Sequence, residues 1–327
     1  MNAVTEQFLD SATLDVSKTL LIGVAGTTGS GKTETAMRLA TGIAGPGNFS
    51  VIDSENKRAL NKKSRYRFAH LDMQAPYSPE HYRDLIEKSV RAGHRAVVID
   101  SFSAEWDDEG GLQDDAAAAL ERMSKGDAAR AERLTALAWK EPKQRHRALM
   151  RYLRKLEVPI IFCLRSEPKI KFTKDERGKT QVVDAGWLPI AEKLFGYDML
   201  VYCLMMPENP GVPVHLKKLE PEFEPMFPLG KQVTEESGRK LAAWASGKES
   251  AAQSASPATA GGAPTSSPPS SASADPMTDD TIAAEVGVLV KSGSYDLALD
   301  LLRGMKDEKR RVEAETRITK KRNEERR

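Results

Sequence analysis

The sequence predicts an α/β fold, in which a mainly parallel β-sheet is flanked by helices. Two observations lead to this prediction. From Thr19 to about Trp244, short apolar runs alternate with segments of helical periodicity, as in chains that cross from one parallel strand to the next through a helix. Each apolar run is also nearly continuous, which is typical of strands that are covered on both faces.

The predicted core strands are five apolar runs: Leu20–Ala25, Phe49–Asp53, Ala96–Asp100, Pro159–Leu164 and Met199–Met205. Three segments between them have helical spacing and lengths that suit crossover connections: Lys32–Ala44, Pro79–Ala92 and Pro142–Leu156. Ligands of such sheets bind beyond the carboxyl ends of the strands. Polar side chains that follow the predicted strands are therefore expected to share one crevice.

Composition divides the 327 residues into four parts. A polar N-terminal tail, residues 1–17, precedes the α/β domain, residues 18–247. Residues 248–276 are almost wholly Ser, Ala, Pro, Gly and Thr. They are too poor in large apolar groups to offset chain entropy, so they predict a flexible linker. Residues 277–327 predict a small helical module that is strongly charged at its end.

Charge and composition restrict the class of protein. The formal net charge is +2, so any basic surface must be local rather than global. Cys163 and Cys203 each lie inside an apolar run and are interpreted as reduced core thiols. No apolar stretch approaches the ~20 residues that a membrane span needs, and the N-terminus does not resemble a secretory leader. We therefore expect a soluble cytoplasmic protein with no membrane partner.

The segment GTTGSGKT matches the phosphate-binding pattern G-x-x-x-x-G-K-[ST]. It follows an apolar strand and opens a predicted helix, which is the context that the pattern requires. Glycines let the backbone wrap around phosphate oxygens, and backbone N–H groups at a helix N-terminus favour negative charge. The segment therefore predicts an ATP site formed by Gly26, Thr27, Thr28, Gly29, Ser30, Gly31, Lys32 and Thr33.

Four side chains supply the predicted chemistry of this site. Lys32 is expected to reach the β- and γ-phosphates, and the Thr33 hydroxyl is expected to ligate Mg²⁺. Asp100 ends the apolar strand AVVID and is the candidate Walker B acid, the second magnesium ligand. Glu55 stands two residues beyond the end of another strand, where its long side chain could activate a water molecule as a general base.

The order of these motifs resembles the core of the RecA-type recombinases. In that family, a strand that ends Asp-x-Glu carries the catalytic base and a strand that ends Val-x-Asp-Ser carries the Walker B acid; Glu55 and Asp100 occupy these positions. A closer resemblance is to phage-encoded RecA-like ATPases of the Sak type, implicated in single-strand annealing and recombination. It covers about residues 18–245 and includes Ile99, Asp100, Ser101, Ser103, Glu105, Trp106, Gly110 and Gly111.

The resemblance implies a RecA-like P-loop core, ATP and Mg²⁺ as cofactors, and ATP hydrolysis that DNA stimulates. It also implies single-stranded DNA as a partner, a homo-oligomer, and a bacterial host cytoplasm as the location. A single-stranded-DNA-binding protein is a further expected partner, through the C-terminal module. The chain lacks the N-terminal polymerisation helix and strand of RecA in recognisable form, which leaves the geometry of the oligomer open.

The resemblance assigns roles to three further parts of the chain. Arg165 stands at the end of the fourth core strand, where RecA carries a polar sensor and Sak-type relatives usually carry Arg, so a catalytic γ-phosphate sensor is implied. The basic segment after it predicts a hairpin that contacts the DNA backbone, through Lys169, Lys171, Lys174, Arg177 and Lys179. Lys217 and Lys218 lie where RecA lysines reach the nucleotide of a neighbouring subunit, and are candidate fingers in trans.

Two other functions stay open at this point. A P-loop kinase of a small molecule would use the same phosphate site, with an Arg-rich lid over the acceptor. A scaffold that binds ATP without hydrolysing it would recruit partners through its tail. Trp106 and Trp139 are interpreted as packing residues, with DNA contact as the alternative, and the five histidines show no metal-ligand spacing.

Overall fold

The structure is a computed structural model, and it describes residues 19–174, 180–228, 230–246 and 307–325, with the single positions 286, 299 and 302. Its strands are β1 (Leu21–Gly26), β2 (Phe49–Asp53), β3 (Ala69–Asp72), β4 (Ala96–Asp100), β5 (Ile160–Lys174), β6 (Thr180–Pro189), β7 (Val201–Met205) and β8 (Pro213–His215). Its α-helices are α1 (Lys32–Ala44), α2 (Pro79–Arg91), α3 (Ala104–Asp107), α4 (Leu112–Ser124), α5 (Ala128–Ala138), α6 (Lys140–Leu153), α7 (Glu235–Ala245) and α11 (Glu308–Glu325). Short 3₁₀ helices are η2 (Arg58–Lys62), η3 (Phe195–Asp198) and η4 (Pro221–Met226).

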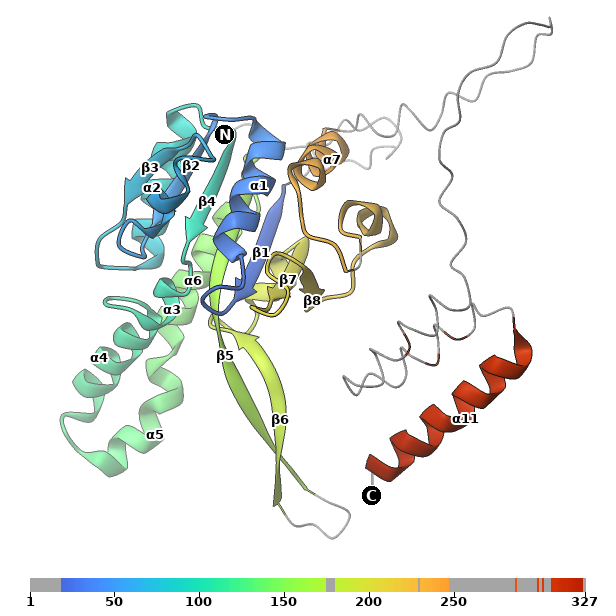
Figure 1. The fold of residues 1–327 in the computed structure, drawn as a ribbon. Helices are drawn as coiled ribbons and strands as arrows, with labels where there is room; N and C mark the ends of the chain where they lie inside the picture. Colours follow the sequence, from blue (N-terminus) through green and yellow to red (C-terminus); the bar gives the residue numbers. More distant parts are fainter. Residues whose placement is uncertain are drawn as a thin grey trace, which may run out of the picture. The chain divides into compact units, whose positions relative to one another are not determined.

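The strands form a mixed, mostly parallel sheet in the order β3-β2-β4-β5-β1-β7-β8 (Figure 1). Parallel pairing joins β1 to β5 and β7, β4 to β2 and β5, and β2 to β3. Strand β8 pairs antiparallel with β7, and β6 pairs antiparallel with β5. The prediction of an α/β fold with a mainly parallel sheet flanked by helices is therefore confirmed.

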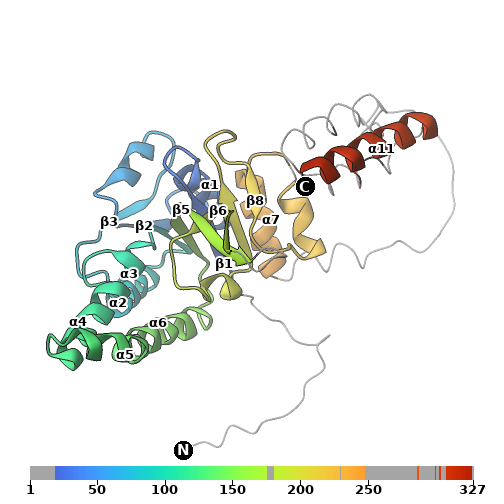
Figure 2. The ribbon, with the colours of Figure 1, turned by 90° about the horizontal axis from the view of Figure 1, so that it is seen from below.

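Helices cover both faces of this sheet, and the side chains of β1 show how (Figure 2). Ile22 and Val24 pack in the layer that includes buried residues of α1 and α7. Leu21 and Ala25 point the other way, into the layer that includes buried residues of α2 and α6. Successive residues of a strand face opposite sides, so a strand between two helical layers is apolar at nearly every position.

The predicted strands and helices are mostly found, but one strand is longer than predicted and several elements were not predicted. The strand expected over Pro159–Leu164 extends to Lys174, because β5 leaves the sheet and continues into a hairpin with β6. Helices α4 and α5 pack against each other as a helical hairpin beyond the sheet (Figure 1). Strands β3 and β8, which lie at the two edges of the sheet, were not among the predicted elements.

The chain folds as two compact units, Met1–Pro257 and Ala258–Arg327, and the boundary falls inside the predicted linker. In the second unit, α11 carries ion pairs of Arg311 with Glu308 and Glu315. The predicted tail 1–17, the linker 248–276 and most of the module 277–327 lie outside the described residues. No helix in the described ranges is both long and apolar enough to cross a membrane.

Candidate nucleotide site

The loop between β1 and α1 has the backbone that the phosphate motif requires. Gly29 and Gly31 adopt φ values of +82° and +87°, a region that side chains disfavour. A β-carbon at Gly31 would lie 2.8 Å from the backbone nitrogen of Gly211, so this position is closed to any other residue. Gly31 is also the N-cap of α1, and no side chain caps this helix. The first N–H groups of α1 are therefore available to an anion.

Lys32 and Thr33 begin α1 and turn toward the neighbouring strands. Lys32 is only 7% exposed, and its ammonium makes no ion pair with any residue that the structure describes. The Thr33 hydroxyl donates a hydrogen bond of 2.7 Å to Asp100 Oδ2. The two expected magnesium ligands, which are far apart in the sequence, are thus brought together.

Asp100 ends β4 and is buried. Its second oxygen, Oδ1, has no hydrogen-bond partner among the described residues, which is unusual for a buried carboxylate. Burial raises the pKa of Asp100 from 3.8 to about 6, and the charge of Glu55 adds to this rise. The hydrogen bond from Thr33 and the charge of Lys32 act in the opposite direction.

These residues fit a magnesium ion. Magnesium is usually bound through one or two carboxylates together with substrate phosphates, and not by a cage of protein ligands alone. Asp100 Oδ1 and the Thr33 hydroxyl would be its protein ligands here. No group of three or more His, Cys, Asp or Glu side chains with the geometry of a metal site occurs in the described part of the chain.

Glu55 follows β2, the strand next to β4, and its position is fixed by Asp53. Asp53 is fully buried, and its two oxygens accept hydrogen bonds from the backbone N–H groups of Glu55 (2.8 Å) and Ala59 (2.9 Å). The Glu55 side chain is 16% exposed and forms an ion pair of 3.0 Å with Arg58. The structure thus places the candidate base close enough to influence Asp100, as expected, and it adds Arg58 as its partner.

Serines hold the ends of β2, β4 and β5 together. The Ser54 hydroxyl donates to the Ser101 carbonyl (2.8 Å) and accepts from the Ser101 N–H (3.0 Å). The Ser103 hydroxyl donates to the Ile190 carbonyl (2.7 Å) and accepts from the Arg165 N–H (2.9 Å). No role was predicted for these two hydroxyls. In the sequence, Ser54 directly precedes Glu55, and Ser103 lies three residues after Asp100.

Arg165 lies next to the P-loop strand, paired in register with Gly26. Its guanidinium contacts Asp107 and Asp108, so in this state it is held by two carboxylates. A role as a sensor of phosphate would require the guanidinium to leave them.

The basic hairpin is confirmed as a β-hairpin formed by β5 and β6. It extends beyond the sheet (Figure 1), and its first paired residue on β5, Ser166, directly follows Arg165. Lys169 forms an ion pair of 2.5 Å with Glu167. Lys171 and Lys174 lie on β5, but their side chains are not among those that the structure describes. Arg177 and Lys179 lie outside the described residues.

The two candidate fingers follow β8. Both lysines are exposed, but the Lys217 ammonium donates a hydrogen bond of 2.7 Å to the Met199 carbonyl of its own chain, whereas the Lys218 ammonium has no such bond with the described residues. Of the two, Lys218 is the more available for a neighbouring subunit.

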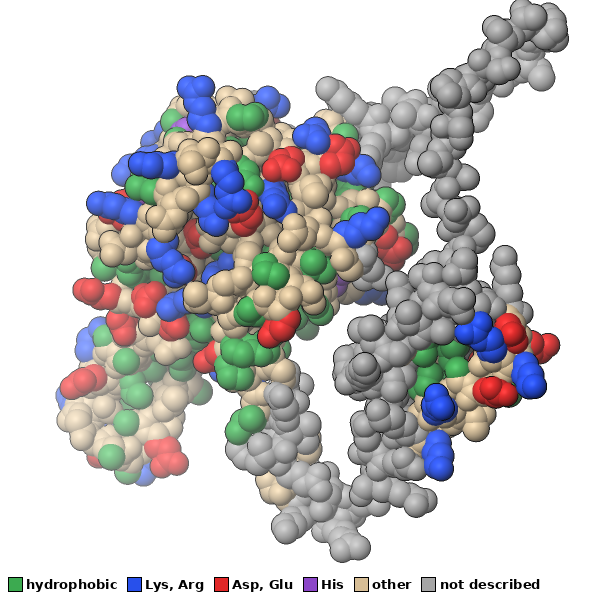
Figure 3. Space-filling view, in the orientation of Figure 1, with side chains coloured by type: hydrophobic (Ala, Val, Ile, Leu, Met, Phe, Trp, Pro, Cys, Tyr) green, Lys and Arg blue, Asp and Glu red, His purple; other side chains and the backbone are tan. Residues whose placement is uncertain are grey.

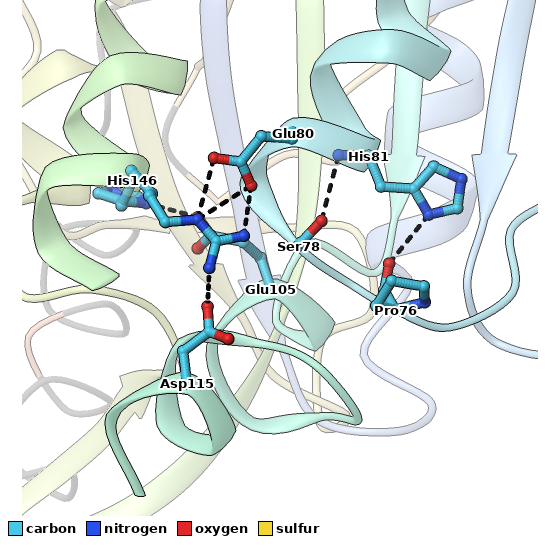
Figure 4. A network of polar contacts seen from close by, with 8 residues as sticks. Pro76, Ser78, Glu80, His81, Glu105, Asp115 and His146 are labelled. Atoms are coloured by element: carbon cyan, nitrogen blue, oxygen red, sulfur yellow. Dashed lines mark hydrogen bonds and ion pairs between the residues drawn. The ribbon is translucent and has the colours of Figure 1, made fainter. Parts of the chain in front are cut away.

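Glu105 and Trp106, which belong to the Sak-type pattern in the sequence, make packing contacts within the domain. Glu105 is buried and accepts a hydrogen bond of 2.7 Å from His146, beside an ion-pair network that joins Arg145 to Glu80 and Asp115 (Figure 4). Burial acts to lower the pKa of His146, but the hydrogen bond and charge of Glu105 outweigh it, so this pKa is raised. Trp106 stacks on Trp139 with ring centroids 5.3 Å apart.

The site residues come from the P-loop and from the carboxyl ends of β2, β4 and β5. These strands are parallel neighbours, so their carboxyl ends lie on the same side of the sheet. The arrangement can bind a polyphosphate through backbone N–H groups and Lys32, hold a magnesium ion, and present a carboxylate to a water molecule.

Comparison of the chain with protein-family models finds no matching family, and comparison with curated proteins finds no significant match.

Proposed function

We propose that the protein is a RecA-like ATPase that binds ATP with Mg²⁺ at residues 26–33 and hydrolyses it in work on single-stranded DNA, in recombination or strand annealing of the Sak type. The observation that carries the ATPase proposal is the hydrogen bond of Thr33 to Asp100, which leaves the buried Oδ1 of Asp100 free to face a cation.

Each residue then has a defined task. Backbone N–H groups at the start of α1 bind the phosphates, and Lys32 neutralises their charge. A bound Mg²⁺ supplies a further charge that stabilises the transferred phosphoryl group. Glu55 orients the attacking water and accepts its proton. Arg165 contacts the γ-phosphate after it leaves Asp107 and Asp108.

DNA and a neighbouring subunit complete the proposal. The β5–β6 hairpin starts beside the nucleotide site and carries lysines along its length, which suits contact with a phosphate backbone. Lys218, with Lys217 as the less available candidate, would reach the nucleotide of a neighbouring copy in a homo-oligomer. The tail is proposed to bind a single-stranded-DNA-binding protein, and the expected cytoplasmic location agrees with MgATP as the substrate.

The test measures MgATP binding and phosphate release with and without single-stranded DNA. Lys32→Ala should lose nucleotide binding while keeping its circular dichroism spectrum, and Lys231→Ala, which changes an exposed lysine, should behave like the parent. Normal binding and turnover in Lys32→Ala would contradict the P-loop assignment. Transfer of phosphate to a small acceptor would favour the kinase alternative, and binding without turnover would favour the scaffold.

A further inference from the structure

The segment between β2 and β3 is unusually basic. Six of the eleven residues 57–67 are Lys or Arg and none is acidic. We call these eleven residues the β2–β3 basic segment; its cations are Lys57, Arg58, Lys62, Lys63, Arg65 and Arg67. In the space-filling view, Lys and Arg side chains are frequent over the part of the surface where β2, β3 and α1 lie (Figure 3). No role was predicted for this segment from the sequence.

The β2–β3 basic segment is held on the core. Its Ala59 is fully buried and donates its N–H to Asp53. The Tyr66 hydroxyl donates a hydrogen bond of 2.6 Å to Glu34 of α1, and Phe68, just beyond the segment, stacks on Phe49. The cations are therefore presented from an ordered backbone, and ligand binding would not be opposed by the entropy of ordering it.

Three acids pair with four of the six cations, so the segment keeps a positive excess. Glu34 pairs with Lys62 (3.1 Å) and Arg65 (2.6 Å). Glu55 pairs with Arg58 (3.0 Å), and Asp72 pairs with Lys57 (3.4 Å).

Several of these cations are open to solvent. The side chains of Lys57, Arg58 and Arg65 are 58%, 56% and 57% exposed. The side chains of Lys63 and Arg67 are exposed as well, and they make no ion pair or hydrogen bond with the described residues. Surface pairs of this kind are weak, so an incoming anion can compete for their cations.

We propose that the β2–β3 basic segment binds the phosphate backbone of single-stranded nucleic acid beside the nucleotide site. The inference rests on the proposed function and adds a second DNA surface to the β5–β6 hairpin. The cations are spread along eleven residues, which suits a repeating phosphate chain better than one isolated phosphate. The single aromatic residue of the segment, Tyr66, is engaged with Glu34, so the contacts go to the backbone and do not depend on base sequence.

This surface is also connected to the nucleotide site. Glu34 is the residue after Thr33, and Glu55 is the proposed base, so two of the acids that pair with the segment belong to the site or adjoin it. A phosphate that attracts Arg58 would weaken its ion pair with Glu55 and free the Glu55 carboxylate to accept a proton. Nucleic acid bound here would therefore increase ATP hydrolysis.

The experiment uses the full chain, a fluorescein-labelled oligothymidine and a series of salt concentrations. The test variant is Lys63→Gln with Arg67→Gln, which removes two cations whose side chains have no partner among the described residues. The matched control is Lys88→Gln with Lys231→Gln, which removes two exposed cations from other parts of the chain. Circular dichroism and MgATP binding establish that both variants are folded.

The test variant should bind the oligonucleotide about 10- to 30-fold more weakly at about 0.1 M salt, with a log–log salt slope flatter by about 1.4. The control should bind like the parent. Parent-like binding by the test variant, with loss of binding when the five hairpin cations are changed to Gln, would overturn this inference and leave the proposed function standing. A parent that hydrolyses ATP but binds no oligonucleotide would overturn both the inference and the DNA part of the proposed function.

Discussion

Asp100→Asn should stabilise the metal-free protein at neutral pH although it removes a magnesium ligand. The rise of the Asp100 pKa from 3.8 to about 6 means that the surroundings of Asp100, burial first among them, disfavour the carboxylate by about 3 kcal/mol relative to the carboxylic acid. Because the pKa is raised in the folded state, the stability that this group contributes is present below about pH 4 and is lost as the pH rises through about 6. Asn is neutral at every pH and does not lose it.

The gain at about pH 7.5 should be about 1–3 kcal/mol. The amide oxygen of Asn can accept the Thr33 hydrogen bond, but the amide nitrogen would stand where Oδ1 has no partner among the described residues, and an unsatisfied buried donor reduces the gain. Urea unfolding in EDTA at about pH 7.5 and about pH 4 measures the effect. The Asn variant should be the more stable at the higher pH, and the two proteins should be nearly equal at the lower one.

Two controls define what would refute this reasoning. Asp84→Asn changes a carboxylate that is exposed on α2 and should have little effect at either pH. MgATP should raise the stability of the parent by mass action but not that of Asp100→Asn. An Asn variant that is no more stable than the parent at neutral pH, or one whose gain is the same at both pH values, would show that burial does not disfavour the Asp100 carboxylate.

The site and its packing support three other predictions. Glu55→Gln should keep MgATP binding and lose hydrolysis by about 10²–10⁴, measured by phosphate release; parental turnover would make Glu55 a bystander. Gly238→Ala in α7 should destabilise the protein by about 1–3 kcal/mol in urea, because the new β-carbon would lie 2.4 Å from the Leu39 carbonyl oxygen of α1; a stability gain would mean that the helices can separate. A chain that ends at Gly247 should keep basal ATPase, and a loss would show that the tail supports the core.

The sequence was most informative where one local pattern determines the structure. Helix α1 and strands β2 and β4 have the predicted bounds, because an uninterrupted apolar run and a glycine-rich turn leave few alternatives. Thr33 and Asp100, the two predicted magnesium ligands, are joined by a hydrogen bond. Their proximity could be predicted, because the carboxyl ends of parallel strands lie on the same side of a sheet.

Features that depend on long-range contacts were not predictable in this way. Strand β3 is short and only half-buried, so its sequence lacks the apolar run by which the core strands were recognised. The roles of Ser54 and Ser103 depend on distant backbone groups. The ion pair of Glu55 with Arg58 was also missed. Several cations follow Glu55 in the sequence, and only the turn after β2 places Arg58, rather than another of them, against the Glu55 carboxylate.

The central position of β1 has a consequence for how the chain is synthesised. Leu21 pairs with Ile160 and Ile22 pairs with Val201, and α1 is covered by α7, whose last residue is Ala245. The strand and helix that carry the P-loop therefore leave the ribosome long before any of these neighbours exist. Contacts so distant in sequence form slowly, and apolar surface exposed meanwhile favours aggregation. The nascent N-terminal third should depend on chaperones until residues near Ala245 emerge, and fragments that end before α7 should be insoluble.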